Sequence, residues 1–295
     1  MKICNQCPRR CAVPRESGEG FCRMPDGIRL ARVALHPWEE PCLSGKNGSG
    51  TVFFCGCNLG CVFCQNRDIS HDSSLGRIVS DEELASLMLS LQERGAANIN
   101  LVTPTHYVHR LVPILRAVKP NLRIPVVYNC GGYESVEALR ALEGLVDVYL
   151  PDVKYFDSSL SERYSKAPDY FSVAAAALEE MLRQRPACIY GDDGSLLSGV
   201  LVRHLVLPGC RRDSISLLRA LAERFGSGAF PLSLMSQYTP DFVPADADSN
   251  LHRRLTSFEY DSVLREAQGL GFTGYLQELH SASSRYTPDF TEQTF

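Results

Sequence analysis

From residue 51 onward, short apolar runs alternate with stretches of helical periodicity, and this alternation limits the folds open to the chain. The apolar runs span 51–55, 98–102, 124–128, 146–150, 199–207, 231–236 and 273–277. Several are nearly continuous, as strands covered on both faces should be. Helices are expected at 80–94, 107–118, 134–143, 170–184, 212–225 and 257–269. The pattern predicts an α/β fold with a parallel sheet and outer helices, open or closed into a barrel.

The first part of the chain has a different character. Residues 1–47 are rich in cysteine, arginine, proline and glycine, show little helical periodicity and end at a glycine-rich and serine-rich turn, 44–50. Such a turn is a plausible linker. We therefore expect two parts: a small cysteine-rich metal-binding segment, 1–47, and the main α/β unit, 48–295.

Composition narrows the class of protein. At 295 residues and 44% hydrophobic, the chain is long enough to bury one large core or two smaller ones. A net charge of −4 with short, mixed charge runs does not predict a nucleic-acid partner. No apolar run reaches the roughly 20 residues of a membrane helix, and the start carries no apolar signal-peptide region. We expect a cytoplasmic protein, whose 12 cysteines serve as metal ligands or buried apolar residues and not as disulfides.

Four cysteines crowd the end of the first predicted strand, and three of them, Cys57, Cys61 and Cys64, have the spacing C-x3-C-x2-C. In parallel α/β folds the working residues lie at the carboxyl ends of the strands. Three thiolates on a tight loop can hold a four-iron cluster and leave one iron open to a small molecule. The alternative is a structural zinc site or buried free cysteines. Zinc usually takes four ligands, and Cys55, separated from Cys57 only by Gly56, has an awkward position for a fourth ligand, so we treat it as packed.

The loop and three other segments carry a family resemblance. The C-x3-C-x2-C spacing with Phe63 before its last cysteine resembles the signature of radical S-adenosylmethionine (SAM) enzymes. The continuation 65–68, which includes Asn66, resembles pyruvate formate-lyase activating enzymes. The chain is most similar to uncharacterised relatives of those activases, which carry similar versions of three further segments: 4–11 (CNQCPRRC), 39–45 (EEPCLSG) and 50–54 (GTVFF).

The resemblance implies a partial (β/α)6 TIM-like barrel of radical SAM type and a reaction. The amino and carboxylate groups of SAM would chelate the open iron of a [4Fe-4S] cluster. One electron, from a reductant such as flavodoxin or ferredoxin, would then cleave SAM to methionine and a 5′-deoxyadenosyl radical that abstracts hydrogen from a substrate.

The first hypothesis for the substrate is a protein or peptide, as in glycyl-radical activation; the second is a small molecule. The chain departs from true activases in lacking the arginine before the first-strand phenylalanine and a ferredoxin-type insert. The rival from another class is a non-catalytic zinc-binding module or an Fe–S electron carrier.

Residues after the later strands are the expected SAM contacts. Thr103-Pro-Thr105-His106 stands where radical SAM relatives often carry Gly-Gly-Glu, so the threonine hydroxyls and backbone are expected to replace that turn. Asp152 and Lys154, two residues apart, point the same way. Arg203 lies in an apolar run and needs an anionic partner, for which the SAM carboxylate is expected. The full set of expected SAM contacts is Phe63, Asn66, Thr103, Thr105, Asn129, Gly131, Asp152, Lys154, Arg203, Met235 and Gln237. The alternatives are a helix-start role for His106, a plain turn after residue 129 and a surface ion pair for Asp152 with Lys154.

A second set of four cysteines lies near the N-terminus: Cys4, Cys7, Cys11 and Cys22. Four thiolates on so short a segment can hold zinc or a second iron–sulfur cluster, and the sequence leaves both open. The segment is too small for a core of its own, which favours a metal staple. His36 and Cys42 are further candidates, although a buried histidine and a packed cysteine are the more expected outcome for them.

Overall fold

A mostly parallel sheet forms the centre of the fold. The computed structural model describes residues 3–16, 20–71, 75–277, 288 and 290. In this part of the chain, the parallel strands of the main sheet are β2 (Ser49–Phe54), β4 (Ile99–Val102), β5 (Val126–Cys130), β6 (Val148–Pro151) and β8 (Leu196–Val200). Antiparallel strands extend it on both sides: β1 (Arg29–His36) and β3 (Arg77–Ile78) next to β2, and β7 (Ile189–Tyr190) next to β8. The predicted α/β class with a parallel sheet is confirmed.

A second, three-stranded parallel sheet contains β9 (Val202–Leu205), β10 (Leu232–Met235) and β11 (Gly274–Leu276). It meets the main sheet through an isolated bridge between Asp152 and Arg203, where the Val153 amide donates to the Arg203 carbonyl at 2.8 Å. The single strand expected at 199–207 is therefore two strands. β8 pairs with β6, and β9, which begins two residues after β8 ends, pairs with β10. Closure of the two sheets into a partial barrel stays a prediction.

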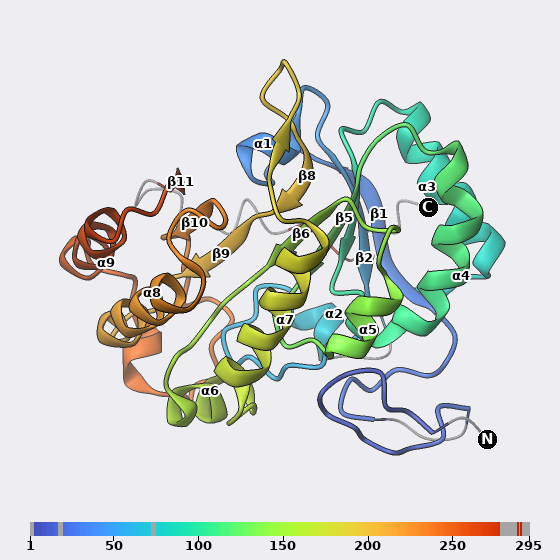
Figure 1. Ribbon diagram of the computed structural model, residues 1–295. Coiled ribbons are helices and arrows are strands. Elements are labelled where there is room, and N and C mark those ends of the chain that lie inside the picture. The colour runs from blue at the N-terminus through green and yellow to red at the C-terminus, as the bar shows by residue number, and fades with distance from the viewer. Residues whose placement is uncertain (1–2, 17–19, 72–74, 278–287, 289, 291–295) are drawn as a thin grey trace.

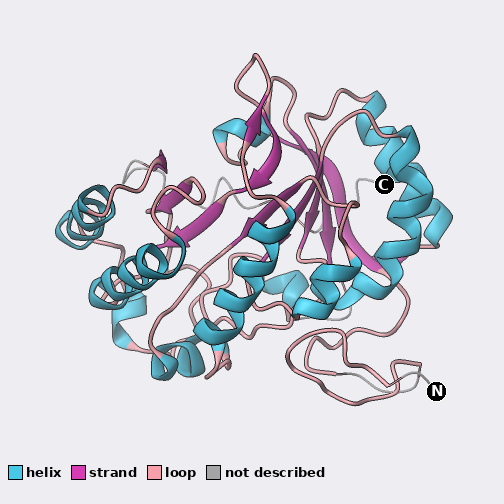
Figure 2. Cartoon of the chain, viewed as in Figure 1, coloured by secondary structure: helices cyan, strands magenta, loops and turns pink. Residues whose placement is uncertain are grey.

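Helices cover the outer side of both sheets (Figures 1 and 2). The longer ones are α3 (Asp81–Glu93), α4 (Val108–Val118), α7 (Tyr170–Gln184), α8 (Arg211–Phe225) and α9 (Ser257–Gly269); the shorter ones are α1 (Pro41–Ser44), α2 (Arg67–Ser70), α5 (Val136–Ala141) and α6 (Ser158–Ser165). Single 3-10 turns lie at Thr105–Tyr107, Lys119–Asn121 and Ser249–His252. Ser80 caps α3, because its side chain accepts from the Glu83 amide, as the sequence pattern predicts.

β1 lies inside the segment 1–47 that the sequence sets apart. It pairs along β2 from Leu30 to His36 and so belongs to the main sheet. Arginines at 29 and 32 interrupt the apolar alternation, and the pairing register shifts between Leu30 and Arg32, which hides the strand from a period-two search. Before Arg29, the described residues form no helix and no strand longer than a single bridge.

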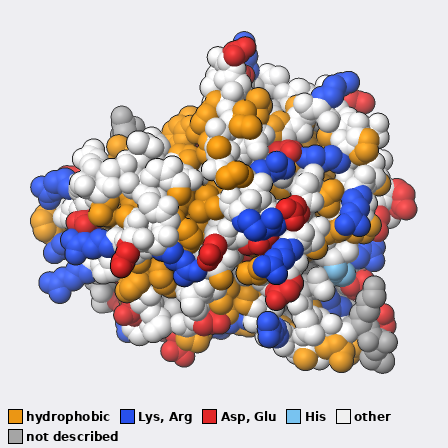
Figure 3. Space-filling model, in the orientation of Figure 1, with side chains coloured by type: hydrophobic (Ala, Val, Ile, Leu, Met, Phe, Trp, Pro, Cys, Tyr) orange, Lys and Arg blue, Asp and Glu red, His pale blue; other side chains and the backbone are white. Residues whose placement is uncertain are grey.

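The core lies between the sheets and the helices. The strands β2, β4, β5 and β6 are buried at every position, which is why they appear in the sequence as apolar runs. Exposed apolar side chains include Ile189, Tyr190 and Leu197 of the β7–β8 hairpin, and Figure 3 shows hydrophobic side chains gathered around it. Within the described residues, no helix is long and apolar enough to cross a membrane.

Candidate active site

The loop 55–66 leaves the carboxyl end of β2 and brings three thiols into the interior. Cys61 is 8% exposed, and Cys57 and Cys64 are half-buried. Each thiol has a polar neighbour: the Leu59 amide donates to Cys57 Sγ at 3.4 Å, Cys61 Sγ lies 2.9 Å from Ser165 Oγ, and Cys64 Sγ lies 3.4 Å from Ser70 Oγ. The loop therefore holds its sulfur atoms in place through hydrogen bonds from the backbone and from helices α2 and α6.

The thiols repel one another when ionised. Burial raises the pKa of Cys57, and the neighbouring Cys61 and Cys64 raise it further. Burial and Cys61 likewise raise the pKa of Cys64 to about 11. The amides of Leu59 and Asn66 and the Lys154 ammonium act in the opposite direction at these two thiols. Three thiolates on this loop require nearby positive charge, which a metal centre would provide.

Cys55 points away from this set. It is fully buried, and its thiol donates to the Leu75 carbonyl at 3.3 Å. Its own carbonyl lies 2.8 Å from His106 Nε2. Burial and the nearby Arg15 lower the pKa of His106 to about 3, so the ring is neutral and Nε2–H donates to this carbonyl. His106 thereby fastens the start of the helical segment after β4 to the end of β2.

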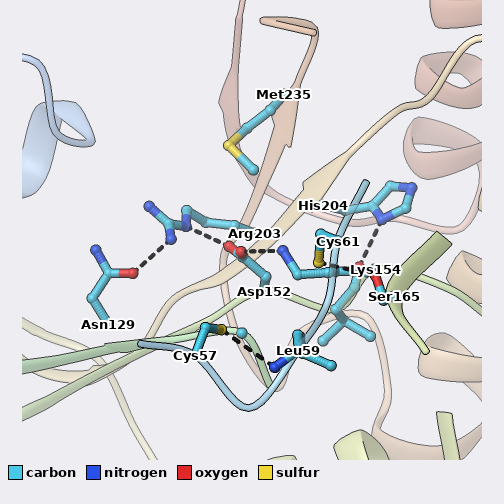
Figure 4. A network of polar contacts seen from close by, with 12 residues as sticks. Cys57, Leu59, Cys61, Asn129, Asp152, Lys154, Ser165, Arg203, His204 and Met235 are labelled. Carbon is cyan, nitrogen blue, oxygen red and sulfur yellow. Dashed lines mark hydrogen bonds and ion pairs between the residues drawn. The ribbon is translucent and has the colours of Figure 1, made fainter. Parts of the chain in front are cut away.

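Opposite the loop, a largely buried ion-pair network joins β6 to β9 (Figure 4). Lys154 Nζ lies 2.6 Å from Asp152 Oδ2, and Arg203 Nε lies 2.8 Å from Asp152 Oδ1. The Asp152 side chain is 17% exposed. Burial acts to raise the pKa of Asp152, but Arg203 and Lys154 hold it below its ordinary value. Burial acts to lower the pKa of Lys154, yet Asp152 and Cys61 raise it, so both groups are charged. Figure 4 shows Lys154 between Asp152 and Cys61, which joins the network to the cysteine loop.

Arg203 has further partners within the chain. Its Nη2 donates to Asn129 Oδ1 at 2.7 Å, and its Nη1 lies 3.7 Å from Glu39 Oε2. The adjacent Glu40 accepts from Ser233 Oγ at 2.9 Å. Burial raises the pKa of both glutamates, while Arg203 opposes that shift. The anionic partner that the sequence demands for Arg203 is thus supplied by Asp152 and Glu39. A contact with the SAM carboxylate stays a prediction.

The turns after β4 and β5 are tied together by a buried carboxylate. Thr103 has φ 60°, a left-handed conformation that a β-branched residue rarely adopts. Thr105 Oγ1 donates to Glu134 at 2.7 Å, and Tyr128 donates to the same carboxylate at 2.9 Å. The Thr105 hydroxyl is therefore engaged by Glu134. Gly131 packs on the cysteine loop, since a Cβ there would lie 2.8 Å from Leu59 Cδ1.

The end of β10 also reaches the cysteine loop. Phe63 and Tyr238 meet edge to face with ring centres 6.1 Å apart. Gln65, next to Cys64, donates to the Gln237 carbonyl at 3.3 Å. Met235 is 6% exposed, and Figure 4 shows its side chain on the far side of Arg203 from Cys57. Asn66 precedes α2, and its carbonyl accepts from the Ser70 amide at 2.9 Å. The structure thus gathers the predicted residues from the ends of β2, β4, β5, β6 and β10 and from the start of β9.

Two positioning residues escaped the sequence analysis. The ring of His204 is buried between the Val153 carbonyl, 2.7 Å away, and Ser214 Oγ, 2.9 Å away. Tyr170 donates to the carbonyls of Gly131 and Asp152 and accepts from the Lys154 amide at 3.0 Å. These two side chains fix the backbone that carries Asp152 and Lys154. In the sequence, each of these residues is marked only as a polar side chain among apolar neighbours. That pattern does not show which group the side chain bonds to.

The donor set suits an iron–sulfur cluster. In the described part of the chain, no three cysteine, histidine or acidic side chains are grouped closely enough to hold a single metal ion. A four-iron cluster holds its thiolates farther apart than one ion does, and its usual ligands are thiolates alone. Cys57, Cys61 and Cys64 supply that set, with hydrogen-bond donors to sulfur and a lysine beside them. The residues present therefore fit a cluster with one iron left open.

The N-terminal cysteines form a separate group. Cys4, Cys7 and Cys22 are buried and Cys11 is half-buried. Burial raises the pKa of Cys7, and the charges of Cys22 and Cys11 raise it further. His36 is half-buried. Cys42 is buried in α1 and packs with Leu43. A metal at this group stays a prediction.

Comparison with known proteins identifies the family. The family model for the radical SAM superfamily matches residues 51–190. An uncharacterized protein of Methanocaldococcus jannaschii is 32% identical over 279 residues, which cover 91% of this chain and 75% of that protein. The chain belongs to the radical SAM superfamily. Radical SAM membership implies a [4Fe-4S] cluster and SAM as cofactors and places the chain among enzymes.

Solved radical SAM structures share the fold. SuiB of Streptococcus suis bound to S-adenosylmethionine has a TM-score of 0.52 and 11% identity, over 77% of this chain and 50% of SuiB. A mutant of spore photoproduct lyase has a TM-score of 0.51 and 11% identity, over 80% of this chain and 78% of the lyase. The chain thus spans half the length of SuiB. At this identity the likeness concerns the α/β fold with its mostly parallel sheet.

Proposed function

We propose that this protein holds a [4Fe-4S] cluster through Cys57, Cys61 and Cys64 and uses it to cleave SAM reductively. The observation that supports this proposal is the position of these thiols: they lie at the carboxyl end of β2, beside the charged network of Asp152 and Lys154. When bound, the cluster and SAM supply methionine and a 5′-deoxyadenosyl radical that abstracts a hydrogen atom. A zinc module or a simple electron carrier would not need this network beside the loop.

In this proposal, the chain's own residues bind the cluster and SAM and orient them. Lys154 places positive charge beside the thiolates, and Asp152 holds Lys154 and Arg203 in fixed directions. Asp152, with Asn129 and Gly131 on the neighbouring strand end, would hold the methionine part of SAM. Met235 and Gln237 at the end of β10 would hold the adenosine part, with Phe63 and Asn66 on the loop. Thr103 offers backbone and hydroxyl groups to the SAM amino group, and Thr105 supports that turn through Glu134.

The substrate in this proposal is a protein or peptide, attacked at a C–H bond as in glycyl-radical activation. Its support is the resemblance of segment 65–68 to pyruvate formate-lyase activating enzymes. A small molecule is the second candidate, because Glu39, Glu40 and Arg203 bring charged groups together with little exposure, and such convergent polar groups are what would orient a polar ligand. A flavodoxin or ferredoxin supplies the electron.

The cofactor part is tested by electron paramagnetic resonance of anaerobically reconstituted protein. Wild type reduced with dithionite should show a [4Fe-4S]+ signal that changes shape when SAM is added. Cys57→Ala should lose the part of the signal that responds to SAM, and the matched control Cys55→Ala, two residues away, should retain it. A signal in wild type that does not respond to SAM would contradict the open iron. Equal signals in both variants would contradict the ligand assignment.

The substrate part needs a separate readout. A peptide whose glycine α-carbon carries deuterium should transfer deuterium into 5′-deoxyadenosine if a peptide C–H is the target. Labelled small polar metabolites, tested in parallel, provide the second arm. Deuterium from a small molecule, with none from peptides or whole proteins, would replace the first substrate proposal by the second and leave the cofactor proposal intact.

A further inference from the structure

The loop that carries Cys61 is docked on the last turn of α6. The amides of Gly60 and Val62, on either side of Cys61, donate to the carbonyls of Ser165 at 3.1 Å and Tyr164 at 2.9 Å. The Ser165 hydroxyl oxygen itself lies 2.9 Å from Cys61 Sγ (Figure 4). Cys61 is 8% exposed and Ser165 is fully buried. The sulfur and the hydroxyl therefore meet away from water, where a hydrogen bond is stronger than at the surface.

Tyr155 determines where the Ser165 hydroxyl directs its proton. The Tyr155 hydroxyl lies 2.7 Å from Ser165 Oγ and, among the described residues, forms no other hydrogen bond. Burial raises the pKa of Tyr155 well above its ordinary value, so the hydroxyl keeps its proton and needs an acceptor. Ser165 Oγ is that acceptor, which leaves the one Ser165 proton for Cys61 Sγ. Tyr155 and Ser165 thus form a relay of two hydrogen bonds that ends on the Cys61 sulfur.

The other two thiols of the loop have longer contacts with their donors. The Leu59 amide lies 3.4 Å from Cys57 Sγ, and the hydroxyl of Ser70 lies 3.4 Å from Cys64 Sγ. The donor at Cys61 is closer and is itself polarised by a second hydroxyl, which strengthens the bond that it donates. The strongest of these sulfur hydrogen bonds is therefore the one to Cys61.

Arg9 of the N-terminal segment holds the loop and α6 together from outside. Its Nε donates to the carbonyl of Asn58, the residue after Cys57, at 2.8 Å. Its Nη2 donates to the Ser165 carbonyl at 3.3 Å, and its Nη1 donates to the Lys166 carbonyl. The Phe21 ring packs against the guanidinium, with its centre 3.8 Å away. Arg9 thereby fixes the backbone of Ser165 relative to the loop, and with it the direction of the Ser165 hydroxyl.

A donor to a ligand sulfur acts on the charge of a cluster. One-electron reduction adds a negative charge to an iron–sulfur cluster and needs no proton, so Ser165 and Tyr155 keep theirs. A hydrogen bond to sulfur strengthens as the sulfur becomes more negative, so it stabilises the reduced cluster more than the oxidised one. Hydrogen bonds to the sulfurs are accordingly one of the factors that set the potential of such clusters.

We propose that the relay from Tyr155 through Ser165 to Cys61 raises the reduction potential of the cluster, and that Arg9 holds the relay in position. Ser165 touches a ligand of the cluster, whereas Tyr155 and Arg9 are positioning residues that act through it. This inference rests on the proposed function, because it needs a cluster on Cys57, Cys61 and Cys64. It adds a role for residues outside the cysteine loop, before SAM or substrate takes part.

An anaerobic redox titration of the reconstituted full chain, followed by electron paramagnetic resonance without SAM, tests the relay. Ser165→Ala should be reduced about tenfold less favourably than wild type, a midpoint about 59 mV lower for a one-electron couple. Ser161→Ala is the matched control and should keep the wild-type midpoint. Ser161 is equally buried in the same helix, but its hydroxyl donates to the Ser158 carbonyl at 3.0 Å and not to sulfur. A Ser165→Ala protein that carries its cluster at the wild-type midpoint would overturn the proposal.

Tyr155→Phe is the second variant, and it decides the matter if Ser165→Ala does not fold or does not hold the cluster. It keeps the ring and the Ser165 hydroxyl but frees that hydroxyl from its donor. The midpoint should fall in the same direction as in Ser165→Ala and by less. A wild-type midpoint in Tyr155→Phe would show that no relay operates. A wild type that forms no cluster on the loop would instead contradict the proposed function itself.

A double variant tests whether Arg9 acts through Ser165. Arg9→Lys keeps the charge but loses the planar group that reaches several carbonyls. Its midpoint should lie below that of wild type, and adding Arg9→Lys to Ser165→Ala should cause no further change, because the donor is already absent. An equal shift in both backgrounds would remove Arg9 from the proposal.

Hydrogen exchange gives a readout of Arg9 that needs no cluster. In the metal-free full chain, the amides of Gly60 and Val62 should exchange about tenfold faster in Arg9→Lys, as expected for the loss of one to two net hydrogen bonds. Arg10→Lys, at the exposed neighbouring position, is the control and should exchange like wild type. Identical exchange in the two variants would show that Arg9 does not hold the loop on α6.

Discussion

Replacing Asp152 by Asn removes the central charge of the largely buried ion-pair network with Lys154 and Arg203. The carboxylate lies 2.8 Å from Arg203 and 2.6 Å from Lys154, and the three side chains are 16 to 19% exposed. Each ion pair contributes roughly 4 kcal/mol of attraction at an effective dielectric constant of about 20. Relief of the carboxylate's desolvation offsets part of that loss, so we expect Asp152→Asn to lower the free energy of unfolding by about 3 to 5 kcal/mol.

Urea unfolding followed by circular dichroism measures this loss, with Asp241→Asn, at an exposed position, as the control. The double variant Asp152→Asn/Lys154→Met should be more stable than Asp152→Asn alone, because it leaves one fewer unpaired buried cation. The pKa of Asp152 is depressed in the folded state, so its contribution is present above pH about 4 and declines as the pH falls below that value. If Asp152→Asn costs no more than Asp241→Asn at pH 7, the network is not the buried anchor described above.

Three further predictions concern single side chains. Burial raises the pKa of Glu134 to about 7, so wild type should lose about 3 kcal/mol of unfolding free energy between pH 4.5 and 7, measured by urea titration at several pH values. Glu134→Gln should remove this slope, and an unchanged slope would exclude Glu134 as its source. Ser165→Ala takes hydrogen-bond partners from Cys61 and Tyr155 and should cost about 1 to 3 kcal/mol; a loss within error would show that neither bond matters. Gly132→Ala would place a Cβ 2.1 Å from the Asp152 carbonyl and should lower the melting temperature far more than Gly144→Ala, where φ is similar (78° and 79°) and no atom lies within 4 Å. Similar losses in both would contradict the close approach.

Much of the main unit was predictable because its strands are buried on both faces. Helices α3, α4, α7, α8 and α9 agree with their expected ranges to within one residue at each end. The split of 199–207 into two strands was not predictable, since both halves are apolar and only pairing with different sheets separates them.

The site was predictable where residues follow a strand end and not where distant segments meet. The loop 55–66 and the pair Asp152 and Lys154 follow their strands directly. Glu39 meets Arg203 across 164 positions of sequence, and Arg9 meets Asn58 across 49, so their partners emerge only from the folded chain. An arginine inside an apolar run does demand an anion, but the run does not say whether the chain or a ligand supplies it.

The most direct test of the account is the formation of 5′-deoxyadenosine. Protein reconstituted anaerobically with iron and sulfide, then given dithionite and SAM, should yield 5′-deoxyadenosine and methionine in equal amounts by liquid chromatography and mass spectrometry. Cys61→Ala should yield neither above background, and Cys55→Ala should yield both. A reconstituted wild type that carries its cluster and forms no 5′-deoxyadenosine would contradict the proposed reductive cleavage of SAM.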